Sequence, residues 1–395
     1  MPWKELSVMD AKVSFIAECR RGEDPMTVLC ERYGISRETG YVWKRRYDAE
    51  GISGLEERSR APHHLAHSTP AAIADQLIAL REQHPYWGAR KLIEVLERRD
   101  PQTCWPAPST VTDILKRAGL VNSRRRRRHA VAPASPFSPV TAANDTWCID
   151  FKGWFRTADG ARCDPLTVTD AHSRYILGLR IMPERSEPVR KAVDELFQEY
   201  GLPLAMRSDN GSPFASIGAG GLTTLSVHWV KLGIRLERIV PGCPQQNGRH
   251  ERMHATLKAE TTRPAAGNLA AQQARFDRFR AEFNDARPHE ALGQQMPAEH
   301  YQRSPRPMPD RVAEPWYDAE HAVRRVRPTG EIKWGGERVF ISEALAGEPV
   351  GITETGSGDW VVRFAAVDLG IIDRRTKKLT RFASPRPPRR EALRT

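Results

Sequence analysis

The sequence predicts a multidomain chain with helix-turn-helix units at the N-terminus, an α/β layered domain in the middle and a small β-barrel near the C-terminus. Three observations predict this organisation. The chain has 395 residues, too many for one compact core when a domain usually takes about 150. Apolar residues recur at helical spacing up to about residue 120, and in strand-like runs from residue 145. After residue 319, short apolar runs alternate with Gly-containing turns.

The chain is basic, with 61 Lys plus Arg residues, 49 Asp plus Glu residues and a formal net charge of +12. This charge favours nucleic acid as a partner, although many soluble proteins are basic for other reasons. The six cysteines include no CxxC pair, so neither a zinc ribbon nor a disulfide framework is indicated. No signal peptide is recognisable, and no apolar run approaches the roughly 20 residues that span a bilayer. We therefore expect a cytoplasmic protein without a membrane partner.

Residues 10–48 predict a helix-turn-helix. An apolar-periodic segment precedes the turn Gly34-Ile35-Ser36, and Ser36 is placed to cap the next helix. The residues that this second helix would present to DNA are Arg37, Thr39, Tyr41, Lys44 and Arg45. A plain helical hairpin with a solvated basic face is the alternative.

A second helical block follows, up to about residue 122. Leu77, Leu80 and Leu92 recur at helical spacing, and "PAPSTVTDILKRAGL" predicts a capped helix that starts near Ser109. The pattern fits a winged or helix-turn-helix unit, which would lengthen the DNA footprint. A linker without periodicity comes next, and it contains five consecutive arginines. A flexible arginine run can lie along phosphates, so the candidate DNA contacts include Arg124, Arg125, Arg126, Arg127 and Arg128.

The middle of the chain predicts an α/β layered domain. "TWCIDFKGWF" and "DPLTVTDAHSRYILGLRIM" give three antiparallel strands. An amphipathic helix that ends near Tyr200, a strand that ends at Asp209 and a helix near 222–232 follow. The strand "IRLERIV", a helix from about Gln246 to Ala259 and a helix with three phenylalanines on one face complete the domain. This order of elements is ribonuclease-H-like.

Three carboxylates stand out in this domain. Asp150 lies among apolar residues within the first strand, and Asp209 ends the fourth strand. Glu251 lies one turn into the helix that starts near Gln246. If the first and fourth strands are neighbours, the two aspartates approach each other and the helix presents Glu251 from the side. Gathered carboxylates repel one another unless a cation neutralises them, and Mg²⁺ binds such oxygens. Taken singly, each has an ordinary alternative: an arginine partner for Asp150, a turn for Asp209 and an exposed helix surface for Glu251.

The segments "WCIDFKG", "RSDNGSPF" and "PGCPQQNGRHERMHATLKAE" resemble the three catalytic blocks of the transposase and retroviral integrase superfamily, in particular bacterial insertion-sequence transposases. "FNDARPHEALGQQMPAEHY" is similar to the segment that follows these blocks, so the likeness covers about residues 145–301. The resemblance implies that Asp150, Asp209 and Glu251 are catalytic and bind metal ions, Mg²⁺ or alternatively Mn²⁺. It also implies that Asn247 and Lys258 lie beside the DNA.

Helical geometry agrees with part of this assignment. Lys258 follows Glu251 by seven residues, nearly two turns, so both side chains point to one face. His254 is close to the same face, and we expect it to be solvated rather than catalytic. The 41 residues between Asp209 and Glu251 exceed the family's common spacing. We place the surplus in the glycine-rich loop "ASIGAGGLTT", where an insertion is tolerated.

The resemblance implies a DNA transposase of bacterial origin, associated with the nucleoid. It would bind the terminal inverted repeats of its element, cleave the 3′ ends and transfer them to target DNA with two metal ions. Its partners would be double-stranded DNA, both element ends and target, and further copies of itself in a dimer or larger assembly. A structure-selective nuclease of the same fold and a catalytically inactive DNA-binding regulator are the alternatives.

The expected domains run in order along the chain. They are a helix-turn-helix domain (1–66), a second helical domain (67–122), an Arg-rich linker (123–143), a catalytic core (144–305), a linker (306–318), a small β-barrel (319–374) and a basic, Pro-rich tail (375–395). The barrel resembles the SH3-like modules that follow many integrase cores, and either DNA binding or packing and dimerisation would suit it. We expect the tail to be disordered when free.

Overall fold

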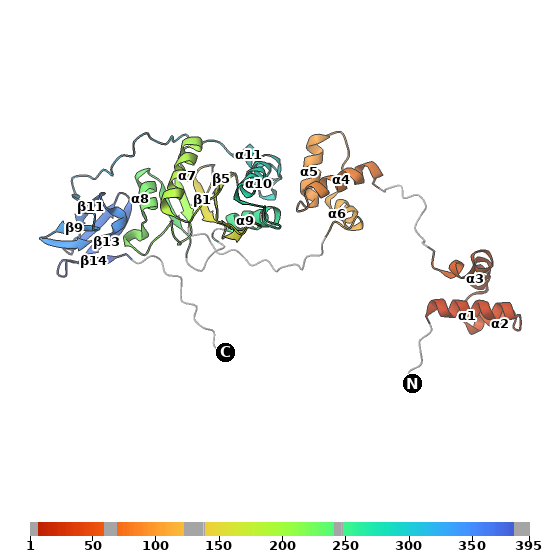
Figure 1. Ribbon diagram of the computed structural model, residues 1–395. Coiled ribbons are helices and arrows are strands. Elements are labelled where there is room, and N and C mark those ends of the chain that lie inside the picture. The colour runs from red at the N-terminus through yellow and green to blue at the C-terminus, as the bar shows by residue number, and fades with distance from the viewer. Residues whose placement is uncertain are drawn as a thin grey trace, which may run out of the picture. The chain divides into compact units, whose positions relative to one another are not determined.

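The structure is a computed structural model that describes residues 7–58, 69–121, 137, 139–240, 246 and 248–382 (Figure 1). The chain divides into two compact units, with the boundary between Thr69 and Pro70. Two groups of candidate DNA contacts, Asn247 and the five arginines at 124–128, lie outside the described residues.

The N-terminal unit is a helical domain with its own core. Its elements are α1 (Val8–Arg21), α2 (Met26–Arg32), α3 (Arg37–Glu50) and a 3₁₀ turn (Gly51–Leu55). The Ser36 side chain accepts a hydrogen bond of 3.1 Å from the Thr39 N–H, which confirms the predicted cap of α3. Gly40 lets α3 approach the other helices, because a Cβ there would lie 2.7 Å from Cys30 Sγ.

The second helical block contains α4 (Ala71–Gln83), α5 (Ala89–Arg99) and α6 (Pro108–Arg117). Leu77, Leu92 and Val111 are fully buried where the three helices meet. The predicted start of the last helix near Ser109 is confirmed, since the helix begins at Pro108, but the predicted cap is absent because Ala107 before it has no side chain that accepts a hydrogen bond. Residues 69–121 form helices and turns without a strand, so the winged alternative does not hold for this part of the chain.

The central domain is built on a mixed five-stranded sheet in the order β5-β4-β1-β6-β7. Its strands are β1 (Thr146–Phe151), β4 (Pro165–Asp170), β5 (Ile176–Ile181), β6 (Ala205–Ser208) and β7 (Arg235–Arg238), with a small hairpin of β2 (Phe155–Arg156) and β3 (Arg162–Cys163) beside them. β1 pairs antiparallel with β4 and parallel with β6. The predicted ribonuclease-H-like order of strands and helices is confirmed.

Helices cover both faces of this sheet. They are α7 (Ser186–Tyr200), α8 (Thr224–Lys231), α9 (Gly248–Thr261), α10 (Leu269–Ala281) and α11 (Pro297–His300), with short 3₁₀ or π segments at Ala219–Gly221, Glu282–Ala286 and Glu290–Leu292. Trp147 and Ile149 of β1 pack with α7 and α8 in one core. On the other face, α9 and α10 share a second core with β5, which contains the three predicted phenylalanines. Because side chains alternate along a strand, Asp150 faces the α9 side.

The C-terminal part is an antiparallel β module, as predicted. Its strands are β8 (Ala322–Arg325), β9 (Glu331–Trp334), β10 (Glu337–Phe340), β11 (Pro349–Glu354), β12 (Trp360–Phe364), β13 (Val367–Ile372) and β14 (Leu379–Arg381), with a 3₁₀ turn at Glu343–Leu345. The main sheet has the order β14-β13-β12-β11-β8, and β9 and β10 form a hairpin. Strand β14 lies in the segment 375–395 that we expected to be a tail. It pairs with β13, so the sheet extends past that boundary to Arg381.

The glycine-rich loop before α8, where we place the surplus residues between Asp209 and Glu251, packs against the C-terminal sheet. Ala219 and Leu222 belong to the same buried core as the C-terminal sheet. A Cβ at Gly220 would lie 3.0 Å from Val367, and Arg381 donates a hydrogen bond of 2.9 Å to the Ile217 carbonyl. The additional residues of this loop therefore form the surface on which the C-terminal sheet packs.

Candidate active site

The strand register brings Asp150 and Asp209 to the same level of the sheet. In the parallel pair of β1 and β6, Thr146 lies opposite Ala205 and Cys148 opposite Arg207, an offset of 59 residues. The same offset places residue 150 opposite residue 209, since 150 + 59 = 209. Neighbouring strands lie about 4.8 Å apart. The two aspartates are therefore adjacent at the ends of neighbouring strands.

Glu251 completes a group of three carboxylates. It lies in the first turn of α9, the helix that packs on the Asp150 side of the sheet. The pKa of Asp150 is raised to about 7, first by burial and then by the charges of Asp209 and Glu251. Among the described residues, no lysine or arginine forms an ion pair with Asp150. The alternative of an arginine partner for Asp150 therefore finds no support there.

Asp209 also shapes the turn that follows β6. Its Oδ1 atom accepts a hydrogen bond of 3.0 Å from the Gly211 N–H, and the Asn210 side chain donates to the Ile239 carbonyl from 2.5 Å. The alternative that Asp209 is a turn residue therefore holds for its Oδ1 atom, which is hydrogen-bonded within the turn.

Two histidines of α9 lie beneath the carboxylates. His250 and His254 are 1% and 7% exposed, so the expectation of a solvated His254 is wrong. Thr167 Oγ1 lies 2.7 Å from Nε2 of both histidines and donates its proton to the Asp150 carbonyl oxygen at 2.9 Å. Because that hydroxyl has one proton, both histidines must donate from Nε2. Burial lowers the pKa of His254 to about 2, so the imidazole is neutral and its Nδ1 atom is unprotonated.

A basic pair lies next to the carboxylates. Lys258 is exposed on α9, seven residues after Glu251. Burial, and after it the charge of Lys258, lowers the pKa of Lys152, so the two ammonium groups are close. Sequence reasoning missed Lys152, although its place two residues after Asp150 was a usable signal. The pair suits the phosphate groups of a nucleic acid.

Two donor sets could hold a divalent cation. Asp150, His250 and His254 have ligand atoms within 4.8 Å of one another. However, both nitrogens of His250 already contact threonine hydroxyls, Nε2 at 2.7 Å and Nδ1 at 2.8 Å. A metal bound there would have to break these hydrogen bonds. The three carboxylates offer the oxygen ligands that a hard cation such as Mg²⁺ or Mn²⁺ prefers, but their oxygens do not all lie within 4.8 Å of one another in this structure.

The candidate DNA-reading residues lie on α3. Arg37, Tyr41 and Arg45 recur every four residues, and all three are exposed. Thr39 and Lys44 are half-buried. Within the described part of the chain, the three basic residues of this set form no ion pair with a carboxylate. Their charges are therefore available to a polyanion.

Four family models match this chain. Two models described as "Integrase core domain" match residues 140–244 and 232–297. A "Helix-turn-helix domain" model matches residues 12–63, and a "Homeodomain-like domain" model matches residues 39–115. The chain carries an integrase core domain behind helix-turn-helix domains. The integrase core family belongs to the polynucleotidyl transferases and generally uses divalent metal ions.

Several curated proteins are similar to the chain. An uncharacterized 39.2 kDa protein of insertion element IS476 from Xanthomonas euvesicatoria is 27% identical over 242 residues, which cover 60% of this chain and 67% of that protein. An uncharacterized 31.7 kDa protein of insertion element IS407 from Burkholderia multivorans is 27% identical over 230 residues, or 58% of this chain and 79% of that protein. The Gag-Pol polyprotein of baboon endogenous virus is 27% identical over 232 residues, which is 13% of its length.

Solved integrase structures are also similar, at low scores. The HTLV-2 integrase catalytic core domain in complex with magnesium covers 41% of this chain and 98% of its own, with 15% identity and a TM-score of 0.33. A simian T-cell lymphotropic virus intasome chain covers 76% of this chain and 100% of its own, with 14% identity and a TM-score of 0.36. The fold assignment rests on the strand order and the family matches.

Among the described residues, no helix is long and apolar enough to cross a membrane.

Proposed function

We propose that this protein is a DNA transposase that cuts the ends of its own insertion sequence and joins them to target DNA. The observation that carries the proposal is the register of β1 and β6, which sets Asp150 beside Asp209 under the helix of Glu251. The integrase core matches and the insertion-element relatives support it.

In this proposal Asp150, Asp209 and Glu251 hold divalent ions. When bound, such ions activate the attacking oxygen and stabilise the leaving one in phosphodiester displacement. His254 would position Asp150 through Thr167, which accepts a hydrogen bond from His254 and donates one to the Asp150 carbonyl oxygen. Lys258 and Lys152 would hold a phosphate beside the reacting bond. Positioning of this kind can supply much of the rate without a covalent enzyme intermediate.

The proposed chemistry has two displacement steps at phosphorus. In the first, a water oxygen attacks the phosphorus at the element end, the bond to the 3′ oxygen breaks, and that oxygen leaves as a 3′-hydroxyl. In the second, this hydroxyl attacks a target phosphorus, loses its proton, and displaces the 3′ oxygen of the target strand. One phosphodiester bond breaks and one forms in the transfer step, so no external energy source is required.

Recognition of the ends belongs, in this proposal, to the N-terminal domains. Arg37, Tyr41 and Arg45 of α3 would read base edges in the major groove, with Thr39 and Lys44 on its flank. Asn247 and the arginine run at 124–128 are proposed as further DNA contacts. Because two ends must be joined together, we expect a dimer or a larger assembly.

The proposal is tested with purified protein, a labelled duplex that carries the ends flanking its gene, and a supercoiled plasmid in Mg²⁺ or EDTA. We expect end cleavage and joining in Mg²⁺, and neither reaction in EDTA. Nicking without joining would favour a structure-selective nuclease. End binding without any product would favour an inactive DNA-binding regulator.

A further inference from the structure

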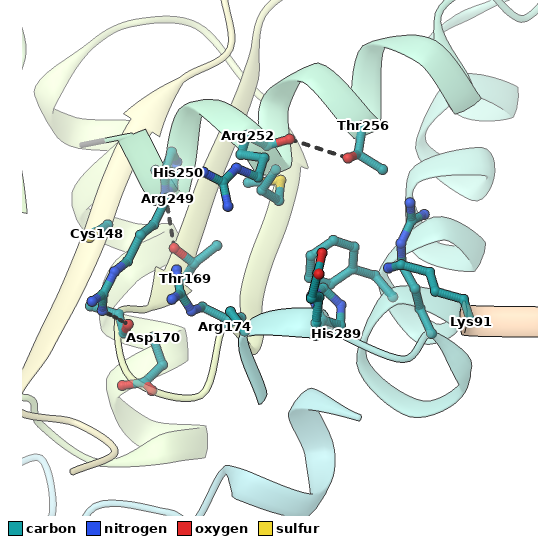
Figure 2. Close-up of a pocket in the computed structure, with 16 residues that line it drawn as sticks. Lys91, Cys148, Thr169, Asp170, Arg174, Arg249, His250, Arg252, Thr256 and His289 are labelled. Carbon is teal, nitrogen blue, oxygen red and sulfur yellow. Dashed lines mark hydrogen bonds between the residues drawn. The ribbon is translucent and has the colours of Figure 1, made fainter. Parts of the chain in front are cut away.

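A cavity lies along a different flank of α9 from the carboxylates. Arg249, Arg252 and Thr256 line it at i, i+3 and i+7, whereas Glu251 and Lys258 project from another side of the helix. Its volume is about 230 Å³. Pockets for drug-sized ligands begin at roughly 300 Å³, so this cavity suits one small group. Figure 2 shows its walls coming from α9, from the β4–β5 turn and from the segment around His289.

Positive charge exceeds negative charge in this cavity. Of its two carboxylates, Asp170 accepts hydrogen bonds from the Asn144 N–H and from the backbone and side chain of Ser173, and Glu290 pairs with Arg90 outside. One lining cation, Arg287, is paired with Glu260. Among the described residues, four lining cations have no carboxylate partner: Lys91, Arg174, Arg249 and Arg252.

Two buried nitrogen atoms of the lining are unsatisfied. Arg174 Nε and His289 Nε2 have no hydrogen-bond partner among the described residues. Such orphaned groups are uncommon. Arg174 Nε is a donor, so it points to a missing anion or water, whereas burial and then the charge of Lys91 lower the pKa of His289 to about 3 and leave its imidazole neutral. Arg174 also has a φ of 68°, in the left-handed region that costs free energy for a residue other than glycine. The β4–β5 turn therefore holds the Arg174 side chain at the cavity against an unfavourable backbone conformation.

The cations of this cavity repel one another. Burial, then the charges of Arg249 and Arg252, lowers the pKa of Arg174 to about 10. Burial, then the charge of Arg287, lowers the pKa of Lys91 to about 8. An anion in the cavity would offset both the repulsion and the loss of hydration.

We propose that this cavity binds a single phosphate group, and that in the complex with DNA the phosphate belongs to the DNA backbone. The assignment of this phosphate to the DNA backbone rests on the proposed function. Guanidinium groups match the geometry of a phosphate with paired N–H donors, which favours phosphate over a simple halide. Lys91 comes from α5, and Arg98 of the same helix pairs with Glu299 of the central domain. A bound phosphate would therefore tie the helical block to the catalytic core.

The first experiment is a melting curve of the full-length protein in sodium phosphate and in sodium chloride at equal ionic strength. Arg174→Gln and Lys91→Met are compared with Arg99→Gln, which removes an exposed cation from the same helix as Lys91 without touching the lining of the cavity. We expect phosphate to raise the Tm of the wild type and of Arg99→Gln saturably, and to leave the other two variants unchanged. If Arg174→Gln fails to fold, Lys91→Met carries the comparison.

The second experiment measures binding of the end duplex against salt concentration. If the phosphate comes from DNA, the slope of log K against log salt falls by about 0.9 in Arg174→Gln and Lys91→Met, the change for one lost phosphate contact. A phosphate effect on Tm with an unchanged slope would overturn the DNA source and leave a free phosphate or nucleotide as the ligand. Absence of both effects would overturn the site. If the phosphate effect is present in a protein that neither cuts nor joins DNA, the proposed function fails and the cavity assignment stands.

Discussion

The Nδ1 atom of His254 faces Asp150 Oδ2 from 3.8 Å, in the interior between α9 and the sheet. His254 is fixed there because its Nε2 atom donates to Thr167 Oγ1 at 2.7 Å. Groups that orient a metal ligand typically contribute 10- to 100-fold to metal affinity or activity. Thr167 in turn donates to the Asp150 carbonyl oxygen at 2.9 Å, so we expect His254 to position Asp150 through Thr167.

We predict that His254→Phe lowers the rate of end cleavage by roughly 10- to 100-fold while the affinity for the end duplex stays unchanged. His254→Gln should recover part of the rate, because its amide can still donate to Thr167. Single-turnover cleavage and a gel-shift titration measure the two quantities. Equal activity of the Phe and Gln variants would contradict a positioning role for the hydrogen bond from His254 to Thr167.

A buried ion pair links β6, the strand just before Asp209, to β7. Arg207 donates from Nε and Nη2 to Glu237 Oε2 at 2.9 and 2.7 Å, and both side chains are about a tenth exposed. Removing one partner leaves a buried charge alone, so Arg207→Met should destabilise the central domain by about 3–5 kcal/mol. The double variant Arg207→Met with Glu237→Leu should regain most of this loss. Urea denaturation measures the difference, and a single variant within experimental error of wild type would contradict the prediction.

Lys91 predicts how stability depends on pH. Its pKa is about 8 in the folded protein and 10.5 ordinarily, so between these values the unfolded chain binds more protons. The contribution of Lys91 to the free energy of unfolding should therefore rise as the pH increases from 8 to 10.5. Lys91→Met should remove that rise, as Tm measured against pH would show. An identical pH slope in the wild type and the variant would argue against a buried, repelled Lys91.

The exposed face of α3 predicts specificity for the element ends. Arg45→Ala should weaken binding to the end duplex by about 1–3 kcal/mol and have less effect on scrambled DNA. Arg32→Gln is the matched control in the same domain, because Arg32 is engaged with Glu18 and Asp24. Equal losses on both DNAs would indicate a phosphate contact in place of base reading.

Much of the site follows from local patterns in the sequence. The order of strands placed Asp150 beside Asp209, and the seven-residue spacing placed Lys258 on the side of Glu251. Ser36 was recognisable as a cap because its hydroxyl reaches a backbone N–H three residues away. The helical spacing and the cap depend on short-range geometry that the sequence specifies directly, whereas the approach of Asp150 and Asp209 was expected only on condition that their two strands pair.

Other features depended on packing between distant segments. A buried face of α9 is marked by the spacing i, i+3, i+4 and i+7 of His250, Met253, His254 and Leu257. The two histidines are polar, so their burial could not be predicted without knowing that Thr167 and Thr169 lie opposite them as hydrogen-bond partners. Lys91 enters the cavity from nearly 160 residues before Arg249. The glycine-rich loop could not be assigned to the C-terminal sheet, because nothing local to it indicates Val367 or Leu369.

The most direct test of the account is the binding of Mn²⁺ to the protein with its end duplex, followed by the loss of the free Mn²⁺ signal in electron paramagnetic resonance. The wild type should bind Mn²⁺, Asp209→Asn should lose it, and His250→Gln should retain it. Asp285→Asn, an exposed carboxylate of the same domain, is the control. Retention by Asp209→Asn together with loss by His250→Gln would show that the histidine cluster holds the metal, and would contradict a site built from Asp150, Asp209 and Glu251.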